Sequence, residues 1–147
     1  MNLIASGDRS VWFGRLADLS KFKSPAPGEY ALLLAVGDDV VEADDQVALS
    51  ELIVRSGCRH AVCFGRTSST WDDSIDWIGV KDEVDGHPSP FVQTSWFDHD
   101  PIEDAVEFFA DHASFGDWCT TDYVVAVVAA SDDFAHQVLR AVRDRFS

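Results

Sequence analysis

The chain has 147 residues, of which 46% are hydrophobic and 25% are charged, and its formal net charge at pH 7 is −15. This composition is typical of one globular domain and excludes a disordered or fibrous chain. No apolar run reaches the roughly 18 residues that a membrane span requires. The start, MNLIASGDRS, has no cationic region leading into a long apolar stretch, so the sequence predicts no secretory signal.

The first 29 residues are the least regular part of the chain. Residues 11–13 (VWF) predict an extra edge strand, residues 16–22 predict a short helix, and SPAPGE reads as a stiff connector. We therefore expect a single α/β domain over residues 1–147, with an irregular N-terminal segment at 1–29 and four strand–helix units at 30–147.

Four short apolar, β-branched or aromatic runs predict buried strands, at residues 30–36, 60–64, 91–96 and 123–130. Near-continuous apolar strands of this kind are typical of a parallel sheet that helices cover on both faces. The pattern predicts a three-layer α/β sandwich with a mostly parallel sheet of four or five strands. We expect flavodoxin- or Rossmann-like βα repeats with a flavodoxin-like strand order.

A segment with helical spacing follows each of these runs. The apolar positions are Val47, Leu49, Leu52, Ile53 and Val54, then Trp71, Ile75 and Ile78, then Ile102, Ala105, Val106 and Phe109, and finally Phe134, Val138, Leu139, Val142 and Phe146. Gly57 predicts the end of the first helix, and Pro101 suits the first turn of the third. Residues 81–90 read as a surface loop.

The stretch GRTSSTWDDSIDW, residues 65–77, resembles a phosphate-cradling loop in its hydroxyl content. It lacks the lysine and the glycine spacing of a P-loop, so we favour a strand-to-helix turn. Ser69 or Thr70 then caps the helix, while Asp76 and Trp77 point outward.

Acidic pairs follow each of the four predicted strands, at Asp38-Asp39, Asp72-Asp73, Asp98 with Asp100, and Asp132-Asp133. Aspartates at helix starts cap free N–H groups, which is the interpretation we favour. The alternative is a magnesium site of Asp38, Asp39, Asp98 and Asp100 in a phosphoryl-transfer or nucleotide-responsive domain. Only Arg66 is placed to steady a transferring phosphoryl group, so the sequence favours a protein that is not an enzyme and has no cofactor.

Residues 82–139 contain 13 acidic residues and no lysine or arginine. Such a field repels nucleic acid and anionic membranes and attracts cationic partners. We therefore expect a cytoplasmic binding protein of the immunity or inhibitor type that neutralises a basic protein, such as a toxin domain. The expected contact residues are Asp98, Asp100, Glu103, Asp104, Glu107 and Asp111, with Trp96 or Trp118 as an aromatic anchor. The oligomeric state stays open.

The three cysteines, Cys58, Cys63 and Cys119, have the spacing of neither a zinc site nor a disulfide framework. Their odd number suits a reducing cytoplasm, and we expect most of them to be small buried apolar groups.

Two stretches carry a shared pattern, VRSGCRHAVCFGRTSSTWDDSIDW and FVQTSWFDHDPIEDAVEFFADHASF. Its marks are Ser56-Gly57-Cys58, Trp71-Asp72-Asp73-Ser74 with Asp76, Thr94-Ser95-Trp96, and Asp100-Pro101 before an aromatic helix. In these marks the chain resembles a bacterial family of about this length that is classified as a domain of unknown function. The resemblance implies an α/β fold and a bacterial, cytoplasmic setting. The family pattern often has a second cysteine where this chain has Thr67 and Ser68, and it implies no catalytic residues.

Overall fold

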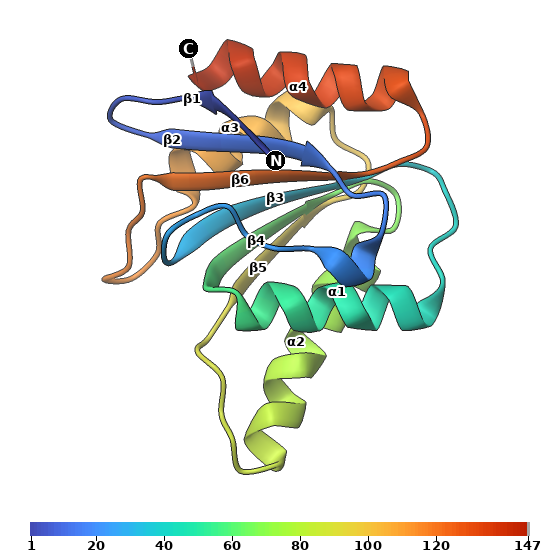
Figure 1. The fold of residues 1–147 in the computed structure, drawn as a ribbon, viewed down its shortest axis with the longest axis vertical. Coiled ribbons are helices and arrows are strands. Elements are labelled where there is room, and N and C mark those ends of the chain that lie inside the picture. The colour runs from blue at the N-terminus through green and yellow to red at the C-terminus, as the bar shows by residue number, and fades with distance from the viewer. Residues whose placement is uncertain (147) are drawn as a thin grey trace.

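A computed structural model describes residues 1–146, so Ser147, the last residue of the expected domain, lies outside the described residues (Figure 1). The elements follow one another as β1 (Asn2–Ala5), β2 (Ser10–Arg15), the short 3-10 helix η1 (Leu19–Lys21), β3 (Tyr30–Val36), α1 (Ala43–Arg55), β4 (Cys58–Phe64), α2 (Ser68–Val84), β5 (Gln93–Phe97), α3 (Ile102–His112), β6 (Asp122–Val128) and α4 (Asp132–Phe146).

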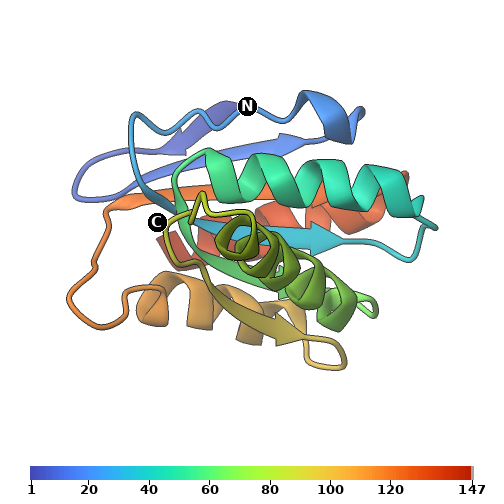
Figure 2. The same cartoon turned by 90° about the horizontal axis from the view of Figure 1, so that it is seen from below.

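The six strands form one sheet in the order β1-β2-β6-β3-β4-β5. The pair β1 and β2 is antiparallel, and every other neighbouring pair is parallel. Helices α1 and α2 cover one face, and α3 and α4 cover the other (Figures 1 and 2). The expected α/β sandwich with a largely parallel sheet is thus confirmed.

The central strand β3 explains why the sandwich has two cores. All seven of its residues are buried. Because successive side chains point to opposite faces, Leu32 and Leu34 pack under α1 and α2, whereas Ala31 and Leu33 pack under α3 and α4. A strand that is apolar on both faces can be stable only between two helical layers.

The expected strand number was wrong, because the sheet has six strands and not four or five. Residues 1–29 contain a hairpin in which Leu3 of β1 pairs with Trp12 of β2. The expected edge strand at 11–13 exists as part of β2, but β1 covers its outer side. The order also differs from the flavodoxin order, because β6 lies between β2 and β3.

Several helix boundaries differ from those expected. Helix α2 continues to Val84, so the loop expected at 81–90 begins later. Its last turns are held because Arg55 of α1 donates to Asp82 at 2.8 Å. The N-cap of α2 is Thr67 without a side-chain cap bond, instead of Ser69 or Thr70, and Pro101 is the N-cap of α3.

Gly65 brings the start of α2 close to the end of β3. Its φ is 127°, and a Cβ added there would lie 2.2 Å from the carbonyl oxygen of Val36. Only glycine fits this backbone contact. Over residues 1–146, no helix combines the length and the apolar character needed to cross a membrane.

Candidate functional site

In a sheet of this kind, ligands bind outside the carboxyl ends of the strands where neighbouring connections diverge. Here that point lies between the neighbouring strands β3 and β6. The helix that follows β3 is α1, the helix that follows β6 is α4, and these two helices cover opposite faces of the sheet. The carboxylate of Asp39 accepts a hydrogen bond from Ala130 N at 2.8 Å. Arg15 donates to Asp132 at 2.5 Å and to the Ala129 carbonyl at 2.8 Å. The protein's own side chains therefore tie this crevice together.

The four aspartates of the magnesium alternative are not gathered at one point. Asp38 and Asp39 follow β3, whereas Asp98 and Asp100 follow β5, and β4 lies between the two strands. Asp38 Oδ1 lies 3.6 Å from Arg66 Nε, and the Asp39 carboxylate accepts a hydrogen bond from Ala130 N. Within the described residues 1–146, no three histidine, cysteine or acidic side chains are placed to hold one metal ion.

The acidic side chains of α3 form one exposed face. Ala105, Val106, Phe109 and Ala110 bury the opposite side of the helix against the sheet. The exposed residues are Glu103, Asp104, Glu107 and Asp111. This division follows the 3.6-residue period of the helix. Asp98 and Asp100 lie just before the helix begins, so they extend the acidic face to the carboxyl edge of the sheet.

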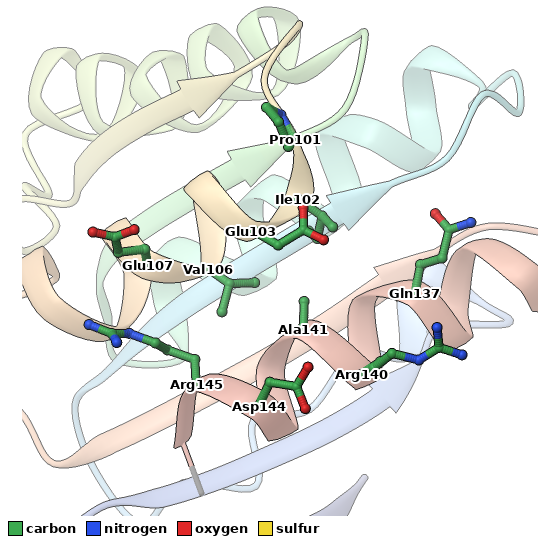
Figure 3. A pocket seen from close by; sticks show the side chains of 10 residues that line it. All are labelled: Pro101, Ile102, Glu103, Val106, Glu107, Gln137, Arg140, Ala141, Asp144 and Arg145. Atoms are coloured by element: carbon green, nitrogen blue, oxygen red, sulfur yellow. The ribbon is translucent and has the colours of Figure 1, made fainter.

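A groove of about 540 Å³ runs between α3 and α4 beside this face (Figure 3). Val106 and Ala141 face each other across its middle, while Glu103 and Glu107 from α3 line it together with Arg140 and Arg145 from α4. Arg145 also forms an ion pair with Asp111. The arginines of α4 thus partly neutralise one side of the acidic face.

The rest of the acidic face has no such compensation. In the part of the chain that the structure describes, no basic side chain lies within ion-pair distance of Asp100, Glu103, Asp104 or Glu107. We call Asp98, Asp100, Glu103, Asp104 and Glu107 the acidic α3 surface. These five residues are the expected contact residues that lie on one continuous surface, formed by the exposed side of α3 and the segment before it.

The two expected aromatic anchors lie apart. Trp96 is 52% exposed on the edge strand β5, next to Asp98 in the chain. Trp118 follows α3 and lies near the amino ends of the parallel strands, before β6 begins. There it packs against Phe115, with ring centroids 5.5 Å apart, and beneath Arg59. Of the two, Trp96 is the one near the carboxyl ends of the strands, where Asp98 and Asp100 follow β5.

Sequence reasoning missed a pair of carboxylates on α2, of which Asp76 contacts β5. Asp72 was expected to cap the helix, yet it lies inside α2 and is only 7% exposed. Asp76 is exposed, as expected, and accepts a hydrogen bond from Thr94 at 3.2 Å. Partial burial and the nearby charge of Asp72 raise the pKa of Asp76. The i,i+4 spacing of the two aspartates was the available signal, because it places both on one side of a helix.

His60 is the second residue that sequence reasoning did not single out. It is buried in β4, where Nδ1 lies 2.7 Å from the Ala113 carbonyl and Nε2 lies 3.0 Å from the Ser95 hydroxyl. A carbonyl can only accept, so Nδ1 carries the proton and Nε2 accepts from Ser95. Burial lowers the pKa of His60. This neutral imidazole connects β4, β5 and the end of α3.

The cysteines offer no reactive thiol in the sheet. Cys58 and Cys63 are buried, as expected for most of the three, and Cys119 is exposed. Burial raises the pKa of both buried thiols, which disfavours the thiolate that nucleophilic chemistry needs.

Comparison with known proteins places the chain in a family without identifying an activity. No curated protein matches it. One family model, described as Domain of unknown function (DUF7684), matches residues 13–145. That range includes β3, β4, β5 and β6 in full, the last three residues of β2 and almost all of α4. The chain therefore belongs to the DUF7684 family, whose defining domain has no known function.

Proposed function

We propose that this protein is an acidic binding module that neutralises a basic protein partner, as an immunity or inhibitor protein does. The observation that supports this most is the acidic α3 surface, where carboxylates are exposed and no basic side chain within residues 1–146 pairs with Asp100, Glu103, Asp104 or Glu107. A cationic surface would be steered onto it and would gain several charge contacts at once.

Two further features support binding over phosphoryl transfer. The four aspartates of the magnesium alternative lie on separate strand ends, and Arg66 already pairs with Asp38. Trp96 exposes its ring beside Asp98, where it can serve as an aromatic anchor at the margin of the acidic α3 surface.

The test is co-expression with the product of the neighbouring gene. We expect the two proteins to co-purify at low salt and to separate as the salt concentration rises, because screening weakens association between exposed charges. The triple variant Asp100→Asn, Asp104→Asn, Glu107→Gln should slow association at least about tenfold, since electrostatic steering acts chiefly on the association rate.

A matched control removes three acidic side chains that lie outside the acidic α3 surface. Asp8, Asp85 and Asp117 are exposed and lie before β2, β5 and β6, respectively. Their change to asparagine alters the net charge equally, so it should leave most of the association rate in place. Clean separation of the two proteins at low salt, or equal effects of the two triple variants, would contradict the proposal.

A further inference from the structure

The strand β5 is the last strand of the sheet, and its outer side pairs with no other strand of residues 1–146 (Figure 1). Unlike β3, it contains no fully buried residue. The Phe97 carbonyl accepts a hydrogen bond from Gly65 N at 3.0 Å, so the backbone polar groups of Phe97 face β4. Because these groups point to alternate sides along a strand, the N–H and C=O groups of Thr94 and Trp96 face outward. They form an open row of donors and acceptors.

The opposite edge strand, β1, is protected in ways that β5 is not. It has only four residues, and its register with β2 shifts between Leu3 and Ala5. The pairing of β5 with β4 has no such shift, and its sequence, QTSWF, contains neither proline nor a charged residue. Bulges, prolines and lysines are the usual devices that prevent a strand from adding to an edge. The edge of β5 is therefore regular, uncharged and open to pairing.

The side chains on the α2 side of this edge favour a cation. Thr94 donates to Asp76 at 3.2 Å, and Trp96 lies on the same face because alternate residues of a strand share a face. Asp76 is exposed, and no basic side chain within residues 1–146 forms an ion pair with it. The Trp96 ring is 52% exposed. A basic side chain next to Thr94 would meet a carboxylate and an aromatic face, and both attract cations.

The side chains on the α3 side of the edge are aromatic. Phe97 packs against Phe108, with ring centroids 5.4 Å apart, and both rings are only partly buried. Phe91, just before the strand, is 63% exposed and contacts the Phe115 ring. The ring of His60 contacts both Phe108 and Phe115, so these groups form one cluster. Exposed apolar surface of this extent is typical of an interaction site.

Two neighbouring elements would hold a strand that is added here. Figure 1 shows the second half of α2 extending past β5, beyond the edge of the sheet, where it would cover one face of the added strand. At its carboxyl end, β5 leads directly to Asp98 and Asp100 of the acidic α3 surface. A segment that pairs with β5 would therefore continue onto that surface.

We propose that the β5 edge binds an extended segment of the basic partner in which basic and apolar side chains alternate. The segment adds a strand to the sheet through the outward N–H and C=O groups of Thr94 and Trp96. This inference rests on the proposed function, because it assigns the segment to the same partner. A second copy of the chain fits less well. The uncharged β5 brings no cation to Asp76, and two chains with a net charge of −15 repel each other.

The first test is an NMR titration of the full chain with the acetylated and amidated hexapeptide KVKVKV. We expect saturable binding in which the amide protons of Thr94 and Trp96 exchange at least about tenfold more slowly, because strand pairing protects them. Exchange at Leu3, on the opposite edge strand, should not change. The matched peptide EVEVEV should bind at least about tenfold more weakly, since it offers no cation to Asp76.

Methylation of the peptide backbone tests the pairing without changing the protein. Methyl groups on alternate backbone nitrogens remove only the donors on one side of the peptide strand. An antiparallel segment should lose at least about tenfold in affinity when the backbone nitrogens of the lysines are methylated, and a parallel segment when those of the valines are methylated. Equal binding of the two methylated peptides and the unmodified one would overturn the proposal.

A variant of the edge tests the same pairing with the product of the neighbouring gene. Thr94→Pro removes one outward N–H group and leaves the groups that face β4 in place, which an edge strand tolerates. It should weaken the affinity for the partner at least about tenfold, because proline cannot donate and its ring occupies the pairing side. Thr94→Val is the matched control. It keeps the N–H group, so its affinity should stay within about threefold of that of the unaltered protein.

The outcomes separate this inference from the proposed function. If the gene product does not bind the chain at all, the proposed function fails, and with it the assignment of the segment to that partner. If the triple variant Asp100→Asn, Asp104→Asn, Glu107→Gln slows association while Thr94→Pro leaves the affinity unchanged, only the strand addition is overturned. Self-association of the unaltered chain that protects the Thr94 and Trp96 amide protons without any peptide would also overturn it, because the edge would then bind a second copy.

Discussion

Gly65 directly follows β4. Its backbone conformation and the neighbouring backbone both require a glycine at this position. A methyl group there would meet the Val36 carbonyl oxygen, and the φ of 127° disfavours any other residue. Gly79 offers a useful contrast within the same connection. It lies in the middle of α2, and a Cβ added there would have no atom within 4 Å.

We therefore expect opposite effects from the same substitution at these two glycines. Gly65→Ala should lower the free energy of unfolding by about 3 kcal/mol or more, from backbone strain and overpacking. Gly79→Ala should raise it by about 0.5–1 kcal/mol, because alanine is the better helix former. Urea unfolding measures both. A loss below about 1 kcal/mol at Gly65 would mean that the close contact with β3 relaxes easily.

His60 predicts a dependence of stability on pH. Burial lowers its pKa in the folded protein below the ordinary value of 6.5, so the unfolded chain binds the proton more tightly. Stability from this group is complete above about pH 6.5 and falls as the pH drops towards the folded pKa. His60→Gln keeps hydrogen-bonding groups but cannot titrate.

The measurement is the free energy of unfolding by urea over a pH series, for both proteins. The difference between the unaltered protein and His60→Gln should shrink as the pH falls below about 6.5, because the histidine loses its advantage there. Carboxylates titrate alike in the two proteins and cancel in the difference. A difference that stays constant across this range would show that His60 does not change its proton affinity on folding.

At the scale of elements, α2 is held by contacts at its two ends. Gly65 positions its start, and the pair of Arg55 and Asp82 holds its last turns against α1. The Asp82 side chain is only 10% exposed. Arg55→Met leaves that carboxylate without its donor, so we expect a loss of about 1–3 kcal/mol. Amide exchange should rise most in the last two turns of α2, since that is where the contact is lost.

Arg66→Met is the matched control. Arg66 faces Asp38 at 3.6 Å, and both side chains are largely exposed. Exposed pairs contribute about 0–1 kcal/mol, so this variant should remain close to the unaltered protein. Equal losses in the two variants would mean that burial of Asp82 does not strengthen its pair.

The same scale shows which parts of the fold the sequence predicts. The strand at residues 30–36 was predicted at its observed bounds, because a strand buried on both faces is apolar throughout. The strand expected at 91–96 begins only at Gln93, since Phe91 is exposed and precedes the ladder. The N-terminal hairpin was missed because β1 has four residues and depends on pairing with β2.

The residues of the candidate sites also differ in how well local sequence predicts their positions. The exposed acids of α3 follow from helical period alone, so local sequence was enough to group Glu103, Asp104 and Glu107. Asp72 is only 7% exposed although it lies near the start of α2, and no local pattern distinguishes it from a solvated or capping aspartate. Trp96 and Trp118 were grouped by type, and the topology places them near opposite ends of the parallel strands.

At the scale of the whole molecule, the net charge of −15 is unevenly distributed. Most of the arginines form hydrogen bonds or ion pairs with other residues of the chain. Arg15 ties β2 to the start of α4, Arg59 bonds Glu29, and Arg145 pairs with Asp111. The unpaired surplus is therefore mostly acidic, and the carboxyl edge of the sheet with the outer side of α3 carries much of it. The same surplus that would attract a basic partner also repels itself.

This self-repulsion predicts that added salt stabilises the folded protein. Raising NaCl from about 0.01 M to about 1 M shortens the screening length from about 30 Å to about 3 Å, which removes repulsion among distant carboxylates. The same salt weakens exposed ion pairs, but each of these contributes only about 0–1 kcal/mol. With 26 acidic residues against 11 basic ones, repulsion dominates. A gain of about 1 kcal/mol would raise the thermal midpoint by about 2–4 °C.

The triple variant Asp100→Asn, Asp104→Asn, Glu107→Gln tests the origin of this effect. It should raise the midpoint at low salt and show a smaller increase with NaCl, because three of the uncompensated charges are gone. The control variant at Asp8, Asp85 and Asp117 removes as much net charge from outside the acidic α3 surface. The rise of its midpoint with NaCl should therefore lie between that of the unaltered protein and that of the triple variant. A midpoint that falls as NaCl rises would show that the ion pairs, such as Arg15 with Asp132, outweigh the repulsion.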